Sequence, residues 1–135
     1  MKKLLPSFLS LVLFGCSSVS TGSDPLVVRA EQAEQTAYNT FDEFLKIDDL
    51  AMANPAVSNT WATSAHPFAA FLRKPVVNGT NTVPFGIATV LSLDKIKLAY
   101  KAGTATSNAL VTALDVLQTT VAQAGQYTSL VNTNK

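Results

Sequence analysis

The sequence predicts an all-α fold, a small antiparallel bundle of three main helices plus short helical pieces. Apolar residues recur at three- and four-residue steps in three long stretches, which begin near residues 25, 85 and 106. Turn-forming residues separate these stretches, and none of the three alternates as a half-buried strand would. Once an N-terminal leader is set aside, about 120 residues remain, enough for one domain with its own core.

The first long helix is expected to begin at Asp24-Pro25, because aspartate caps helices and proline is tolerated in the first turn. It should continue to about Met52, where Asn54-Pro55 ends it. One face of this helix carries an apolar stripe, formed by Ala30, Ala33, Ala37, Phe41, Phe44, Leu45 and Ile47.

The middle of the chain has a broken pattern. We expect a short helix near 56–65, an interruption at Pro67, and another turn or two of helix from Pro67 to Arg73. Residues 76–79 read Val-Val-Asn-Gly, a turn signal that is compatible with a small hairpin. With Pro75 and Pro84 at its ends, the segment is expected instead to form a surface loop.

The second long helix is expected over 85–102, ended by Gly103. One face is predicted to carry Ile87, Val90, Leu91, Asp94 and Leu98, and Leu93, Ile96 and Tyr100 broaden it. Thr104 or Thr106 should cap the third helix, whose heptad pattern is formed by Leu110, Leu114, Leu117, Val121 and Ala124. Fraying is expected after Gly125 or Tyr127, with a loose tail over 131–135.

The charges are unevenly placed along the chain. Residues 24–49 contain seven acidic and two basic side chains, a balance of −5, and later residues have a balance of +4. Pairing of the acidic first helix with the basic later helix is the favoured interpretation, and two solvated faces without contact are the alternative. Without Lys2 and Lys3 the net charge is −1, which argues against nucleic acid as a partner. No nucleotide-binding motif occurs either.

Aromatic side chains are expected to supply much of the core, namely Phe41, Phe44, Trp61, Phe68, Phe71 and Phe85. Three of them, Trp61, Phe68 and Phe71, lie in the irregular middle of the chain, where recognition surfaces often occur. They are the candidate partner surface, although core packing is the more common role of such residues.

The N-terminus has the build of a secretory signal. Lys2 and Lys3 precede an apolar run over 4–14, and the run ends at Gly15-Cys16. This run is too short to span a bilayer, which requires roughly 20 apolar residues. Cys16 is the one cysteine of the sequence, so disulfides within the chain are excluded.

Residues 13–16, Leu-Phe-Gly-Cys, resemble the lipobox of bacterial lipoproteins, although Phe14 fills a position where smaller residues are usual. The resemblance implies a signal peptide over 1–15, cleavage between Gly15 and Cys16, and diacylglycerol and N-acyl chains on Cys16. The chain would then comprise a lipidated tether over 16–23, a helical domain over 24–130 and a tail over 131–135. Ser17 and Ser18 after the cysteine favour the outer membrane of the cell envelope over the inner one.

The residues that carry chemistry are few. Metal sites built from His and Cys are excluded, since the sequence has one histidine and Cys16 is expected to carry lipid. Asp42-Glu43 and Asp48-Asp49 are the best carboxylate cluster for a cation, and a solvated helix face is the expected alternative. His66 is expected to be a helix-boundary residue with a satisfied ring nitrogen rather than a general base. No cofactor is expected apart from the covalent lipid.

These observations favour a lipid-anchored envelope protein that binds a partner or has a structural role and catalyses no reaction. An envelope enzyme acting on cell-wall material is the competing class. Residues 28–31, 40–46 and 97–101 also look like short stretches of small helical phage or prophage proteins. That resemblance implies a phage-encoded lipoprotein that excludes further phage by blocking a receptor.

Overall fold

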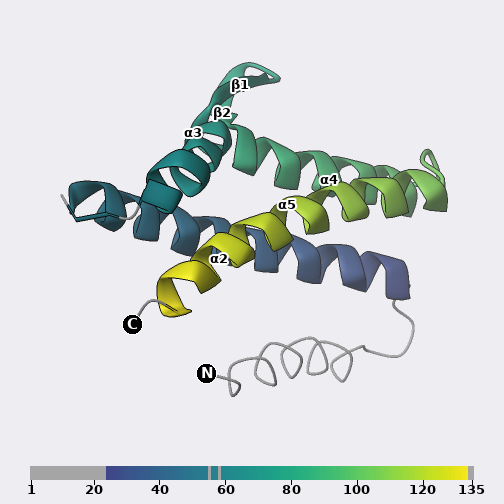
Figure 1. Cartoon of the computed structure of the whole chain (residues 1–135). Helices are drawn as coiled ribbons and strands as arrows, with labels where there is room; N and C mark the ends of the chain where they lie inside the picture. Colours follow the sequence, from purple (N-terminus) through teal and green to yellow (C-terminus); the bar gives the residue numbers. More distant parts are fainter. Residues whose placement is uncertain (1–23, 55, 58, 134–135) are drawn as a thin grey trace.

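The computed structural model describes residues 24–54, 56–57 and 59–133. Three long helices run side by side: α2 (Pro25–Ala53), α4 (Phe85–Lys101) and α5 (Ser107–Thr133). In Figure 1, α2 and α5 run in one direction and α4 runs in the other. A π-helix η1 (Trp61–Ala65), a short helix α3 (His66–Arg73) and the strands β1 (Pro75–Asn78) and β2 (Asn81–Pro84) connect α2 to α4. The predicted all-α class is confirmed.

Helix α2 begins where the sequence predicts. Asp24 is its N-cap, and the Asp24 carboxylate accepts a hydrogen bond of 2.8 Å from the backbone N–H of Leu26. The predicted stripe is buried from Ala30 to Phe44 and half-buried at Leu45 and Ile47, and the buried face ends on an acidic residue, Asp48. The buried residues are Val27, Ala30, Ala33, Ala37, Phe41, Phe44 and Asp48.

Pro67 does not interrupt the helix in the middle of the chain, so that expectation is wrong. The backbone N–H of His66 bonds to the carbonyl of Trp61, five residues earlier, which is the wide turn of a π-helix. Pro67 then lies in the first turn of α3, where a missing N–H costs no helical hydrogen bond. η1 and α3 therefore follow one another without a gap.

The segment between Pro75 and Pro84 is a β-hairpin and not the expected loop. β1 and β2 pair antiparallel, with Val76 opposite Val83 and Asn78 opposite Asn81. Gly79 has a φ of 65°, which glycine adopts without strain in such a turn. The two prolines pair at the base, at the strand ends, where proline is tolerated. The hairpin projects from the bundle (Figure 1).

Helix α4 ends at Lys101, and Gly103, the predicted terminator, follows the C-cap Ala102 with a φ of 78°. Its buried face is only partly the predicted one, since Val90 and Leu93 are buried as expected but Gly86 and Lys97 complete the face. Leu98, placed on the buried face by the pattern, is 54% exposed. Apolar residues lie on so much of the circumference of α4 that periodicity alone does not select the buried stripe.

Helix α5 is capped by Thr106, whose Oγ1 accepts a 3.1 Å hydrogen bond from Ala109 N. The heptad leucines Leu110, Leu114 and Leu117 are buried. The helix continues through Gly125 to Thr133, so the expected fraying point is wrong. Residues 131–133 form its last turn, and the rest of the expected tail lies outside the described residues.

Aromatic rings join the last turns of α5 to α2 and α3. The ring of Phe44 lies 5.9 Å from Trp61, 5.5 Å from Phe68 and 5.9 Å from Tyr127, measured between centroids. Phe71 packs on Phe85 at 4.4 Å but is 45% exposed, so its assignment to the core is wrong. This cluster explains why α5 stays helical beyond Gly125.

Candidate functional site

A buried carboxylate at the C-terminal end of α2 is the most distinctive polar feature of the described chain. Asp48 is 1% exposed. Its carboxylate accepts hydrogen bonds of 3.0 Å from Trp61 Nε1 and 2.8 Å from Arg73 Nη1. His66 Nδ1 lies 3.1 Å from each carboxylate oxygen. We call Asp48, Trp61, His66 and Arg73 the Asp48 centre.

Three elements meet at the Asp48 centre. Asp48 comes from α2, Trp61 from η1, His66 from the start of α3 and Arg73 from its end. The Arg73 guanidinium also donates to the carbonyl of Leu45 at 3.1 Å and to the carboxylate of Asp49 at 2.7 Å. Arginine suits this role, since its planar fork of donors serves several acceptors at once.

The centre keeps Asp48 ionised. Burial acts to raise the pKa of the Asp48 carboxyl, but hydrogen bonds from Arg73, Trp61 and His66 outweigh burial and hold the pKa below its ordinary value of 3.8. The buried charge is thus matched by donors on several sides, as a buried carboxylate requires.

The pairing of Asp48 with His66 has one chemical consequence. A carboxylate at Nδ1 orients the imidazole ring and favours the tautomer that leaves Nε2 as an acceptor. The His66 side chain is 40% exposed. Among the described residues, His66 Nε2 has no hydrogen-bonding partner. His66 is at the helix boundary that the sequence indicates, with its Nδ1 satisfied by Asp48.

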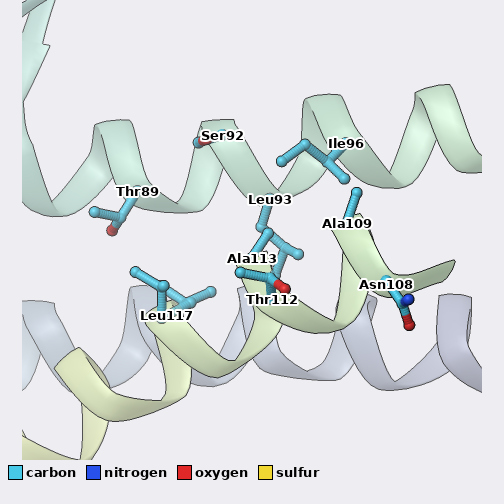
Figure 2. Close-up of a pocket in the computed structure, with 10 residues that line it drawn as sticks. Thr89, Ser92, Leu93, Ile96, Asn108, Ala109, Thr112, Ala113 and Leu117 are labelled. Carbon is cyan, nitrogen blue, oxygen red and sulfur yellow. The ribbon is translucent and has the colours of Figure 1, made fainter. Parts of the chain in front are cut away.

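Two surface hollows lie away from this centre. One is an open groove of about 530 Å³ between α4 and α5, where Leu93 and Ile96 face Ala109 and Ala113 (Figure 2). The other, of about 670 Å³, lies between the start of α2 and the end of α4, and it is bordered by Asp24 on one side and Tyr100 on the other. The groove is mainly apolar, and residues of the Asp48 centre line neither hollow.

A second buried ionic group joins α2 to α4. Lys97 Nζ lies 2.9 Å from Glu34 Oε2 and 2.9 Å from Asp94 Oδ1, and Lys97 is 6% exposed. Burial acts to lower the pKa of Lys97, but hydrogen bonds to Glu34 and Asp94 outweigh it, so the pKa lies above its ordinary value. The predicted pairing of the acidic helix with the basic one is therefore present.

The candidate cation cluster is divided by the fold. Asp42, Glu43 and Asp49 are exposed, as expected for a solvated face. Asp48 is buried, so the expectation is wrong for that residue. In the described ranges within 24–133, no group of three or more His, Cys, Asp or Glu side chains is placed to hold a metal ion.

The candidate partner surface is also divided. Trp61 is 3% exposed and Phe68 is 8% exposed, so both are core residues and not a contact surface. Phe71 alone of the three reaches the surface.

The predicted cleavage and lipidation residues, Gly15 and Cys16, lie outside the described residues. Among the helices that the structure describes, none has the length and apolar character to cross a membrane.

Sequence patterns did not identify the Asp48 centre, although one signal was available. Asp48 follows Phe44 by four residues and Phe41 by seven, so an acid occupies the next position of the apolar stripe. A charge at such a position must find partners, and these partners lie 13 to 25 residues away in the sequence.

No family model, curated protein or solved structure matches this chain.

Proposed function

We propose that the protein is a lipid-anchored envelope protein whose helical domain binds another protein and catalyses no reaction. The observation that carries the proposal is the order of features at the N-terminus: Lys2 and Lys3, an apolar run, and Gly15-Cys16. Acyl chains on Cys16 would hold the domain on the membrane, since each buried methylene contributes about 0.8 kcal/mol and several chains act together.

The start of the folded domain supports this arrangement. α2 begins at Pro25, capped by Asp24, so residues 16–23 separate the lipid from the bundle. Eight residues span about 15 Å as a random coil, and at most about 28 Å when fully extended. The tether would therefore keep the bundle close to the bilayer without embedding it.

The contacts of the Asp48 centre support a structural role for this buried acid. The Asp48 carboxylate accepts hydrogen bonds from Trp61 of η1 and Arg73 of α3. These hydrogen bonds join η1 and α3 to α2. A catalytic acid has to face its substrate, whereas Asp48 is 1% exposed.

Fractionation of expressing bacteria, followed by intact-mass measurement, tests the proposal. We expect the wild-type chain in the membrane fraction, lacking residues 1–15 and heavier than the remaining chain by a diacylglyceryl group and an acyl chain. Cys16→Ala should lack the added mass and keep its leader. Wild-type protein with an intact leader and an unmodified thiol would rule the proposal out.

One observation favours a second candidate, a hydrolase of cell-wall material with His66 as general base. The ring is oriented by a buried carboxylate and is 40% exposed, an arrangement that suits proton transfer. Digestion of purified peptidoglycan by the wild-type protein, abolished in His66→Gln and retained in Thr63→Ala, would replace the first proposal with this one. No release of soluble fragments by the wild type would remove the second candidate.

A further inference from the structure

We infer that the domain stands on the membrane on its α4–α5 turn and presents the hairpin end to a protein surface that combines carboxylates with apolar side chains. This inference rests on the proposed lipid anchor at Cys16. We define the hairpin end as Phe71, Lys74 and the hairpin Pro75–Pro84.

The orientation follows from where the chain enters the bundle. The Tyr100 hydroxyl donates to Asp24 Oδ2 at 2.7 Å, so the start of α2 lies beside the end of α4. The tether leaves the bundle at that point, next to the turn that leads into α5. That end of the molecule therefore lies nearest to the bilayer.

The hairpin lies at the other end of α4. The backbone N–H of Phe85, the first residue of α4, donates to the carbonyl of Lys74 at 2.8 Å, which fixes the hairpin base to the start of the helix. α4 has 17 residues, so about 25 Å of helix separates the hairpin base from the tether end. Figure 1 shows the hairpin projecting from the bundle at that end.

The charges near the hairpin specify the partner. No aspartate or glutamate occurs between Asp49 and Asp94. Arg73 is held by Asp48 and Asp49, so its charge is matched within the domain. Lys74 is exposed and forms no ion pair with any described residue. The hairpin end therefore offers a free cation, and its electrostatic complement is a carboxylate.

The same end exposes apolar side chains. Val77 is 80% exposed, and Phe71 is 45% exposed while its ring is held against Phe85. An isolated two-stranded hairpin is marginally stable in water, so one that projects with an uncovered valine is suited to contact with another surface. An aromatic ring already packed at the base loses little entropy when a partner covers it.

A protein fits this end better than a lipid surface does. The tether spans at most about 28 Å, and it begins at the opposite end of the bundle. A bundle standing on that end carries the hairpin away from its own bilayer. In this orientation the hairpin can contact proteins that project from the same membrane or lie opposite it.

A fluorescence experiment on the lipidated full chain tests the orientation. Because Cys16 is consumed by lipid, an introduced cysteine is the thiol that reacts with the dye. An environment-sensitive dye at Ser107→Cys, the first residue of α5 and next to the α4–α5 turn, should be quenched by nitroxide-labelled phospholipids in vesicles. The same dye at Thr80→Cys, on the hairpin tip, should be quenched far less. Equal quenching, or stronger quenching at Thr80→Cys, would overturn the inference in favour of a membrane-facing hairpin.

A photo-crosslinking experiment in cells tests the partner chemistry. A photoreactive amino acid replaces Thr80, and the yield of the main adduct is measured in the presence of further substitutions. Lys74→Glu and Val77→Asp should each reduce the yield by roughly fivefold to tenfold, the effect of losing a central contact. The matched changes Lys95→Glu and Val116→Asp, at exposed positions of α4 and α5, should leave the yield unchanged.

Three results would overturn the partner assignment: the absence of an adduct, an adduct with a second copy of this chain, or equal loss with the control substitutions. Intact mass of the same samples separates this inference from the proposed function. An unmodified Cys16 would remove the anchor itself. A lipidated chain with a quenched hairpin, or with one of these three crosslinking results, would leave the anchor standing and remove only the inference.

Discussion

The two ends of the bundle are held together by different means. Towards the start of α2, small side chains such as Ala30 and Ala33 let the helices approach closely, and the Lys97–Glu34 ion pair joins α4 to α2. Towards the end of α2, aromatic rings surround Phe44, and the Asp48 centre ties η1 and α3 to the helix. The first region repeats a periodic pattern, whereas the second depends on a few polar atoms that lie far apart in the sequence.

The largest effect on the free energy of unfolding is expected at Phe44, whose ring packs against three other aromatic rings. Phe44→Ala removes a buried ring that touches Trp61, Phe68 and Tyr127, and it should lower the free energy of unfolding by roughly 3–5 kcal/mol. Urea unfolding followed by circular dichroism measures this. Val116→Ala, at a 57% exposed position, is the control and should change little. Equal stability of Phe44→Ala and wild type would contradict the core assignment.

Removal of the Asp48 carboxylate should have the next largest effect. Asp48→Ala leaves the Trp61 N–H and part of the Arg73 guanidinium without an acceptor, which should cost about 3 kcal/mol. Asp49→Ala breaks only an exposed pair with Arg73 and should cost at most about 1 kcal/mol. If the two variants unfold at the same urea concentration, the Asp48 centre does not join the elements as described.

The ion pairs of Lys97 provide a comparison at the other end. Lys97→Met keeps the aliphatic stem but leaves the partly buried carboxylate of Glu34 without its cation, which should cost about 2 kcal/mol. Lys95→Met, at an exposed position of the same helix, should be nearly neutral. The double variant Glu34→Gln/Lys97→Met should recover part of the loss, as a double-mutant cycle would show. Absence of any coupling would mean that the pair contributes nothing.

The acid sensitivity of the domain should come mainly from the Asp48 end. Because hydrogen bonds hold the pKa of Asp48 below 3.8, its contribution to stability is present above pH 3.8 and is lost as the pH falls through the folded-state pKa. Wild-type stability should therefore fall more steeply below pH 3.8 than that of Asp48→Asn. Parallel curves for the two proteins, measured by urea unfolding between pH 2 and 5, would count against this assignment.

The smallest effects are expected at two glycines. Gly103 has a φ of 78°, so Gly103→Ala should destabilise the α4–α5 turn by about 1 kcal/mol. Gly125 lies inside α5 and has open space around a Cβ, so Gly125→Ala should stabilise the domain by roughly 0.5–1 kcal/mol. Thermal unfolding of both variants measures the difference, and shifts of the same sign would contradict the assignment.

The sequence predicted the region that depends on periodicity better than the region that depends on polar contacts. The stripe of α2, the cap at Asp24 and the leucines of α5 are local patterns, and the fold follows them. The predicted face of α4 is right for Val90 and Leu93 but wrong for Leu98, because apolar residues surround the helix and contacts with α2 and α5 select the buried stripe. The missing N–H of Pro67 predicts a break in the helix. The π-helix η1 instead places Pro67 in the first turn of α3, where the missing N–H costs no helical hydrogen bond.

The candidate site was less accessible from the sequence. The partners of Asp48 lie on η1 and α3, and only the folded chain brings them to the end of α2. Pro75 and Pro84 favour a loop over a hairpin in the sequence, because proline lacks a backbone N–H. That expectation is wrong because the two prolines pair at the strand ends, where proline is tolerated. The candidate contact residues share an irregular segment, yet Trp61 and Phe68 point inward while Phe71 reaches the surface.

We propose that covalent lipid on Cys16 fixes this domain to a membrane. Mass spectrometry of the N-terminal tryptic peptide, taken from membranes of expressing cells, tests it most directly. We expect a peptide that runs from Cys16 to Arg29 and carries a diacylglyceryl group on its sulfur and an acyl chain on its amine. A peptide that begins before Cys16, with the sulfur free, would contradict it.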